Sequence, residues 1–128
     1  MKYRISNTGK IKTFKDLNVW KEGHLLVLSI YKITELFPKE ELFGLIDQMR
    51  RSAVSITSNI AEGFSRQGIK EKLQFYYISE GSLTELYNQI LIAKDIKLVN
   101  NKSFEGIENQ IIKVGKILTG LIRSTKNL

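Results

Sequence analysis

The 128-residue chain has no cysteine, a single proline and 42% hydrophobic residues, enough apolar volume for one core of ordinary size. Without cysteine there can be no disulfide framework, thiolate metal site or cysteine nucleophile. Turn residues are too few for a β-sandwich, so long stretches are free to be helical. We therefore expect one all-α domain.

The formal net charge is +7, and it is unevenly placed. Residues 1–15 carry five basic side chains and residues 109–128 carry four, with no acid in either segment. Residues 16–108 hold 11 basic and 13 acidic side chains. Clustered positive charge is typical of a phosphate-backbone binder. Basic residues at helix C-termini or in solubilising tails give the same pattern, so charge alone leaves both interpretations open.

The N-terminal segment lacks the apolar stretch of a signal peptide. The longest apolar run, around residues 25–30, is far shorter than a membrane span. We expect a soluble cytoplasmic protein with no membrane contact.

Residues 1–13 show no periodicity and are predicted to be a flexible basic arm, followed by a bundle domain over 14–128. A first helix is predicted from Val19 until Pro38, which cannot continue the backbone hydrogen-bond ladder. Its apolar stripe is Val19, Gly23, Leu26, Ile30, Ile33 and Phe37. A second stripe of Trp20, Val27 and Tyr31 widens the apolar face.

A second helix is predicted to restart near residues 39–41 and to end at Gly63 in a left-handed C-cap. A third is expected over about 69–94. The fourth shows a heptad seam: Phe104, Ile107, Ile111, Val114, Leu118 and Leu121. Short connections favour antiparallel neighbours, so we predict an up-down-up-down four-helix bundle.

The sequence contains no motif typical of a catalytic, metal-binding or phosphate-binding site. His24 is the only histidine, and no Glu-x-x-His pair could build a di-metal site in a bundle. No glycine-rich loop leads from a strand into a helix, and the serines of the second helix have no partner base. We expect no catalytic residue, metal or cofactor, and hence no enzyme.

An up-down-up-down bundle brings the start of the first helix, the connection between the second and third, and the end of the fourth to one pole. We predict that the basic residues near this pole contact nucleic acid. They are Lys2, Arg4, Lys10, Lys12, Lys15, Arg66, Lys70, Lys72, Arg123 and Lys126.

Three consecutive aromatic residues, 75–77, fan through about 200° on a helix and cannot all face one core. Together with the doubled stripe of the first helix, they indicate apolar surface beyond what a monomer buries. We predict an oligomer interface containing Trp20, Tyr31, Phe75, Tyr76 and Tyr77. Base stacking by the aromatic triplet is the less favoured alternative.

Arg50 and Arg51 are interpreted as structural. Asp47 precedes Arg51 by one helical turn. Counting from the connection, Glu80 falls level with Arg51 on the antiparallel neighbour. We predict an ion pair between Glu80 and Arg50 or Arg51.

Several ordered motifs carry a family resemblance over about residues 14–95: residues 14–20, 37–38, 41–45, 48–51, 55–56, 59–63 and 81–86. With these motifs the chain resembles the four-helix bundle proteins encoded within intervening sequences of bacterial 23S ribosomal RNA genes. That family is similar in turn to the accessory variability determinant proteins of diversity-generating retroelements.

The resemblance implies a homopentameric barrel with a basic surface and no enzymatic activity. It also implies nucleic-acid binding in the retroelement relatives, where it supports a reverse transcriptase. It also implies structural roles for four residues. Trp20 and Phe43 would pack in the bundle, Gly63 would cap the second helix, and Gly81 would allow a neighbouring helix to approach closely. Glu80 stands where the family pattern is variable and often basic, which weakens a phosphate contact from that face.

Two hypotheses follow. The first is a non-enzymatic homo-oligomeric scaffold that binds RNA or DNA through backbone contacts. Its possible partners are a second copy, a nucleic acid and a reverse-transcriptase-like protein. The alternative is a protein-interaction module that docks a partner protein through exposed apolar and aromatic surface.

Overall fold

The computed structural model describes residues 10–128, except the side chains of Leu42 and Phe43. Four long helices dominate it: α1 (Asn18–Thr34), α2 (Asp47–Ser65), α3 (Ile69–Asp95) and α4 (Asn101–Lys126). A 3₁₀ turn, η1 (Phe14–Asp16), precedes α1, and η2 (Lys39–Glu41) and a π-helical segment, η3 (Leu42–Ile46), precede α2. No strand occurs over these residues, so the predicted all-α class with four helices is confirmed.

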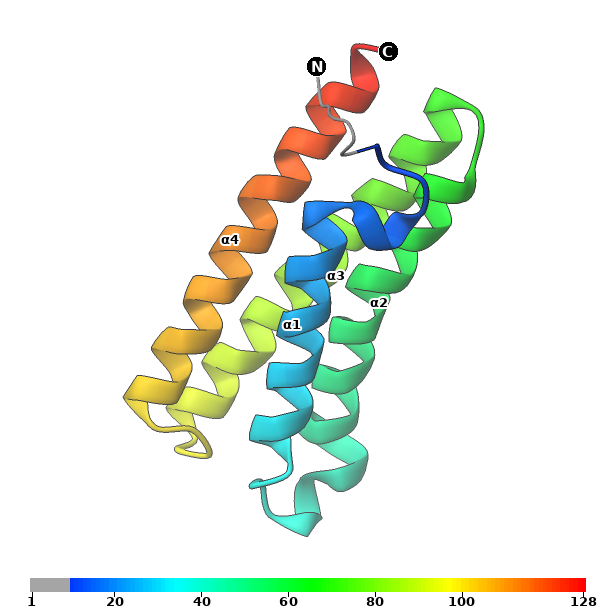
Figure 1. Cartoon of the computed structure of the whole chain (residues 1–128). Helices are drawn as coiled ribbons and strands as arrows, with labels where there is room; N and C mark the ends of the chain where they lie inside the picture. Colours follow the sequence, from blue (N-terminus) through cyan, green and yellow to red (C-terminus); the bar gives the residue numbers. More distant parts are fainter. Residues whose placement is uncertain (1–9) are drawn as a thin grey trace.

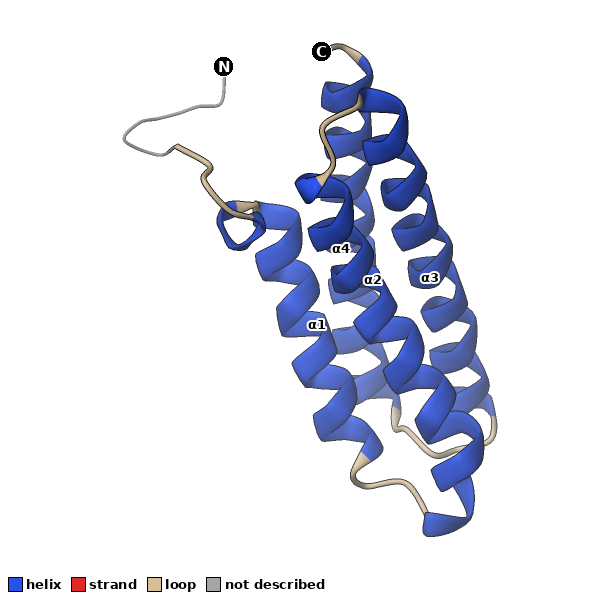
Figure 2. Ribbon diagram, turned by 90° about the vertical axis from the view of Figure 1, so that its right-hand side faces the viewer, coloured by secondary structure: helices blue, strands red, loops and turns tan. Residues whose placement is uncertain are grey.

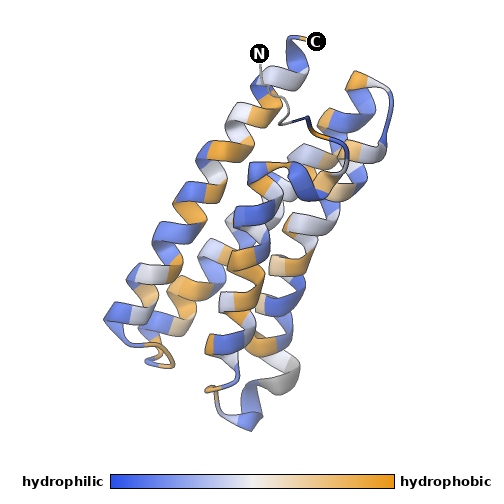
Figure 3. Cartoon of the chain, in the orientation of Figure 1, coloured by the Kyte–Doolittle hydropathy of each residue, from blue (hydrophilic) through white to orange (hydrophobic). Residues whose placement is uncertain are grey.

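The four helices lie side by side, and each runs in the opposite direction to the one before it (Figure 1). α1 and α3 each pack against both α2 and α4, so the helices follow one another around the bundle (Figure 2). Apolar positions recur along every helix between hydrophilic ones (Figure 3), and one face of each helix supplies the core. Within residues 10–128, no helix is long and apolar enough to cross a membrane.

The entry to α2 differs from the predicted restart near residues 39–41. Regular α-helix begins only at Asp47, after the η2 and η3 turns. Gly44 interrupts the helical geometry with φ −109° and ψ −109°. This segment forms a kink and not the first turn of a straight helix.

Small polar side chains set the register between α2 and α3. The hydroxyls of Ser55 and Ser82 lie 2.7 Å apart, and the Ser79 hydroxyl donates to the carbonyl of Ile56 at 2.8 Å. These contacts place residue 51 level with about residue 85, so that Glu80 lies more than one helical turn away.

The predicted ion pair between Glu80 and Arg50 or Arg51 is therefore wrong. Arg51 pairs with Asp47 on its own helix, with Nε and Oδ2 3.0 Å apart. The guanidinium of Arg50 donates to the Thr34 hydroxyl at 2.9 Å and lies 4.6 Å from the ring centroid of Tyr31.

The aromatic triplet divides among three environments, which corrects one predicted interface residue. Tyr76 is only 2% exposed and lies in the core, so it cannot join an oligomer interface. Phe75 is half-buried beneath the guanidinium of Arg66, and Tyr77 is 44% exposed. Consecutive helical positions differ by about 100°, and only the middle ring faces the other helices.

Gly63 has a different role from the predicted left-handed cap. No described glycine has a positive φ, and α2 continues through Gly63 to Ser65. A Cβ at position 63 would lie 2.6 Å from Cε1 of Tyr76, so only glycine lets this buried ring approach α2. At Gly81, by contrast, a Cβ would meet nothing within 4 Å, and the predicted close approach there is wrong.

We predict that Gly63→Ala destabilises the protein by about 1–3 kcal/mol, because the added methyl group overpacks against the Tyr76 ring. Gly81→Ala is the matched control and should stabilise α3 by about 0.5–1 kcal/mol. Urea unfolding at one protein concentration measures both. Wild-type stability of Gly63→Ala would contradict the packing role.

Burial raises the pKa of Tyr76 to about 12. The folded-state pKa lies above the unfolded value of about 10. The contribution of the buried, neutral Tyr76 to folding stability is therefore fully present below pH 10 and is lost as the pH rises towards 12. We expect the free energy of unfolding of Tyr76→Phe to fall less than that of wild type as the pH rises over that range. Urea unfolding at pH 9, 10 and 11 measures this. Tyr77→Phe, at an exposed ring, should follow wild type, and identical pH profiles for all three proteins would refute the expectation.

Candidate nucleic-acid interface

The fold gathers basic side chains at one end of the molecule. The start of α1, the α2–α3 connection and the end of α4 lie at the same end (Figure 1). Eight of the ten predicted nucleic-acid residues lie in the described part of the chain. Lys2 and Arg4 lie outside the described residues. We call the end formed by residues 10–16, 62–72 and 123–126 the basic end.

The segment before α1 is fixed by a capping box at η1. The Asp16 carboxylate accepts hydrogen bonds from the backbone N–H groups of Lys12 at 2.8 Å and Thr13 at 3.0 Å. The hydrogen bonds from Thr13 and Lys12 lower the pKa of Asp16. Lys10, Lys12 and Lys15 around this turn are all exposed, so η1 presents their charges to solvent.

Two predicted contact residues are instead used within the chain. The Lys72 ammonium donates to the carbonyls of Phe64 at 2.8 Å and Gly63 at 3.3 Å, which caps the end of α2, and burial lowers its pKa. Arg66 pairs with Glu62 at 2.8 Å and lies 4.9 Å from the ring centroid of Phe75. Both side chains are therefore committed to the α2–α3 hairpin.

The remaining basic residues are more accessible. Lys70, Arg123 and Lys126 are exposed. The Lys126 ammonium lies 5.7 Å from the ring centroid of Tyr77, so the end of α4 lies beside the first half of α3. Together with the three lysines near η1, these cations come from three separate parts of the chain.

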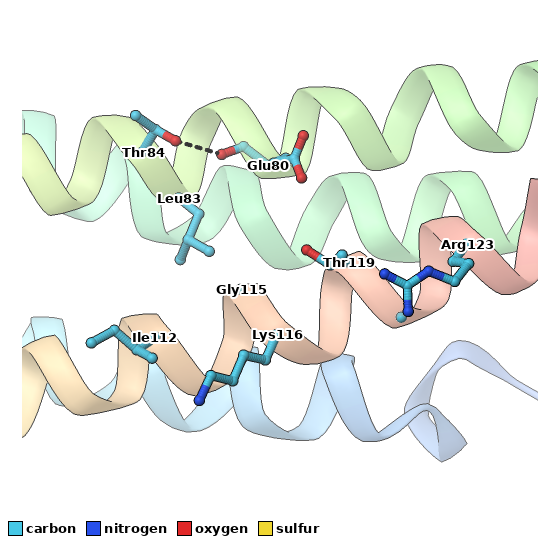
Figure 4. Close-up of a pocket in the computed structure, with 9 residues that line it drawn as sticks. Glu80, Leu83, Thr84, Ile112, Gly115, Lys116, Thr119 and Arg123 are labelled. Atoms are coloured by element: carbon cyan, nitrogen blue, oxygen red, sulfur yellow. Dashed lines mark hydrogen bonds between the residues drawn. The ribbon is translucent and has the colours of Figure 1, made fainter.

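An open groove of about 500 Å³ between α3 and α4 adjoins the basic end (Figure 4). It is lined by Glu80, Leu83, Thr84, Ile112, Gly115, Lys116, Thr119, Gly120 and Arg123. Lys116 was not among the predicted residues, although it precedes Arg123 by seven positions and hence shares its helix face. The Glu80 carboxylate opposes these cations, so the groove is of mixed charge.

Two residues of the predicted oligomer interface, Trp20 and Tyr31, have partners within the chain. Trp20 is half-buried between Phe14 and His24. Tyr31 is 39% exposed, with Arg50 over its ring. Within residues 10–128, no group of three or more histidine, aspartate or glutamate side chains could hold a metal ion.

The fold and the charge distribution define a small helical bundle with one strongly basic end. The family model of the 23S rRNA-intervening sequence protein matches residues 15–120, and the chain belongs to this family. A crystal structure from Bacteroides thetaiotaomicron, described as a protein with unknown function from the S23 ribosomal protein family, shares the fold. The TM-score is 0.76 at 20% identity, covering 82% of this chain and 95% of that one. No curated protein matches the sequence.

Proposed function

We propose that this chain is a non-enzymatic, homo-oligomeric scaffold that binds RNA or DNA through the phosphate backbone. The observation that carries the proposal is the group of exposed cations at the basic end: Lys10, Lys12, Lys15, Lys70, Arg123 and Lys126. Of the acids there, Glu62 is neutralised by its ion pair with Arg66, whereas the Asp16 carboxylate stays ionised and accepts backbone N–H groups. Glu71 is the remaining acid.

The opposite end of the bundle has no such excess. Five basic and six acidic residues nearly cancel there: Lys32, Glu35, Lys39, Glu40, Glu41, Asp47, Lys94, Asp95, Lys97, Lys102 and Glu105. A polyanion is therefore attracted to one end of the molecule and not to its whole surface. Flexible lysines favour phosphate contacts, which position a nucleic acid without reading its sequence.

Self-association is supported by apolar surface that the chain does not cover. Leu25 is 51% exposed and Leu28 is 52% exposed on the outer side of α1. Ile78 on α3 is 50% exposed. An oligomer would carry several basic ends, and simultaneous contacts raise the affinity for a long polyanion. A pentamer is the state that the family resemblance implies.

The alternative function, docking of a partner protein, uses the same observation. Leu25 and Leu28 could pack against a different protein instead of a second copy. Binding through apolar contact depends weakly on salt, whereas binding to phosphates releases counterions and weakens steeply as salt rises.

We expect the protein to bind RNA fragments at low salt, with log Kd rising linearly with log salt. In Lys70→Gln/Arg123→Gln the magnitude of this slope should fall by about 0.7 per lost phosphate contact to single-stranded RNA. Lys39→Gln/Lys102→Gln, at the opposite end, is the charge-matched control and should bind as wild type. Gel shifts at several salt concentrations measure this, and equal slopes for both variants would remove the basis of the proposal.

We expect Leu25→Glu/Leu28→Glu to lower the subunit count measured by light scattering, because charge at an apolar interface is costly. Leu36→Glu, at an 82% exposed position beyond α1, is the control and should leave the assembly unchanged. An unaltered mass for the double variant would rule out this face of α1 as the interface.

A further inference from the structure

Three aromatic rings contact one another in a row at the start of α1, and two of them are stacked. The rings of Trp20 and His24 are nearly parallel, at 14°, with centroids 4.7 Å apart. Phe14 meets Trp20 edge-on, at 65° and 5.4 Å between centroids. Trp20 and His24 are four residues apart, so they are neighbours on the helix surface. We call Phe14, Trp20 and His24 the aromatic stack.

The stack leads outward from the core to solvent. Phe14 and Trp20 are partly buried and pack against the core, whereas His24 is exposed. Core packing explains the first two rings, because each covers apolar surface. It does not explain His24, which adds an aromatic face beyond Trp20 at a position open to solvent.

Exposed cations flank the stack. Lys15 is adjacent to Phe14 in η1, and Lys10 and Lys12 precede it. Lys21 is exposed and precedes His24 by three residues, which makes the two side chains neighbours on α1. Aromatic rings beside a positively charged path are the combination that binds single-stranded nucleic acid, since bases stack on rings while cations follow the backbone.

A further ring, that of Tyr31, lies on the same side of α1. Tyr31 follows Trp20 by 11 residues, about three turns, and its ring carries the guanidinium of Arg50 at 4.6 Å. Tyr31 follows His24, the outermost ring of the aromatic stack, by seven residues, so these two rings are about 10 Å apart along the axis.

We infer that the aromatic stack is a stacking platform for an unpaired base of a single-stranded nucleic acid. A base lies on the outer face of His24, and the adjoining phosphates lie along Lys15 and Lys21. The inference rests on the proposed function and deepens it, because it adds a contact that duplex RNA cannot make. Paired bases are covered by their neighbours in the helix, whereas an unpaired base offers its ring face.

The fluorescence of Trp20 tests this directly, because it is the only tryptophan of the chain. The full-length protein is titrated with a 12-nucleotide oligoadenylate RNA, the DNA of the same sequence, and an RNA duplex of equal length. We expect both single strands to alter the emission of Trp20, saturating at the Kd obtained from gel shifts. The duplex should bind without this change.

Substitutions at His24 separate stacking from charge. His24→Ala should weaken single-strand binding about 5- to 150-fold, the range that loss of one stacked base gives, and leave duplex binding unchanged. His24→Phe keeps a ring face and should retain single-strand affinity. Lys21→Gln should reduce the salt dependence but keep the fluorescence change. Circular dichroism checks that the variants fold, which the exposed position of His24 favours.

The possible results distinguish this inference from the proposed function. If single strands bind while Trp20 emission stays constant and His24→Ala binds like wild type, the platform is wrong and backbone binding stands. If His24→Phe loses as much affinity as His24→Ala, the contact is not stacking, and the inference fails. If no nucleic acid binds at low salt, both the proposed function and the platform are overturned.

Discussion

The packing of the Tyr76 ring on Gly63 is the contact on which the arrangement of the basic end depends. It brings the start of α3 against the end of α2 at a distance that no side chain at position 63 would allow. The serine contacts further along hold the same two helices in one register. With the hairpin held so closely, the Lys72 ammonium reaches the last carbonyls of α2 and caps them. The hairpin is therefore a rigid unit that fixes where the charges of residues 66–72 lie.

This rigidity has a consequence for binding. Arg66 and Lys72 stabilise the hairpin, and a phosphate would have to compete with Glu62 for one and with backbone carbonyls for the other. The cations left for an external partner come from η1, the first turn of α3 and the last turns of α4. Because these segments are far apart in the chain, the basic end exists only in the folded state. Binding of a polyanion would then stabilise the fold by linkage.

The sequence predicts helices better than the relations between them. The α3 bounds and the seam of α4 follow from apolar periodicity, and the structure departs from that seam only at its end, where Ile122 is buried and Leu121 is partly exposed. A straight helix drifts from a seven-residue repeat, which explains that departure. Register is a different matter: no periodicity within one helix sets its height against another, and the predicted ion pair of Glu80 is wrong for this reason. The role of Gly63 also cannot be predicted from local sequence, because it depends on contact with the Tyr76 ring, 13 residues further along the chain.

Charge and stacking would act differently on the two forms of RNA. A duplex carries the denser line of phosphates, so electrostatic attraction alone favours it over a single strand. Stacking on His24 adds free energy only for an unpaired base and persists when salt weakens the phosphate contacts. At low salt the basic end would therefore hold either form, and as the salt concentration rises the preference would move towards the single strand. Such a protein would select unpaired segments of a folded RNA by the physical difference between its two kinds of contact, without reading a base sequence.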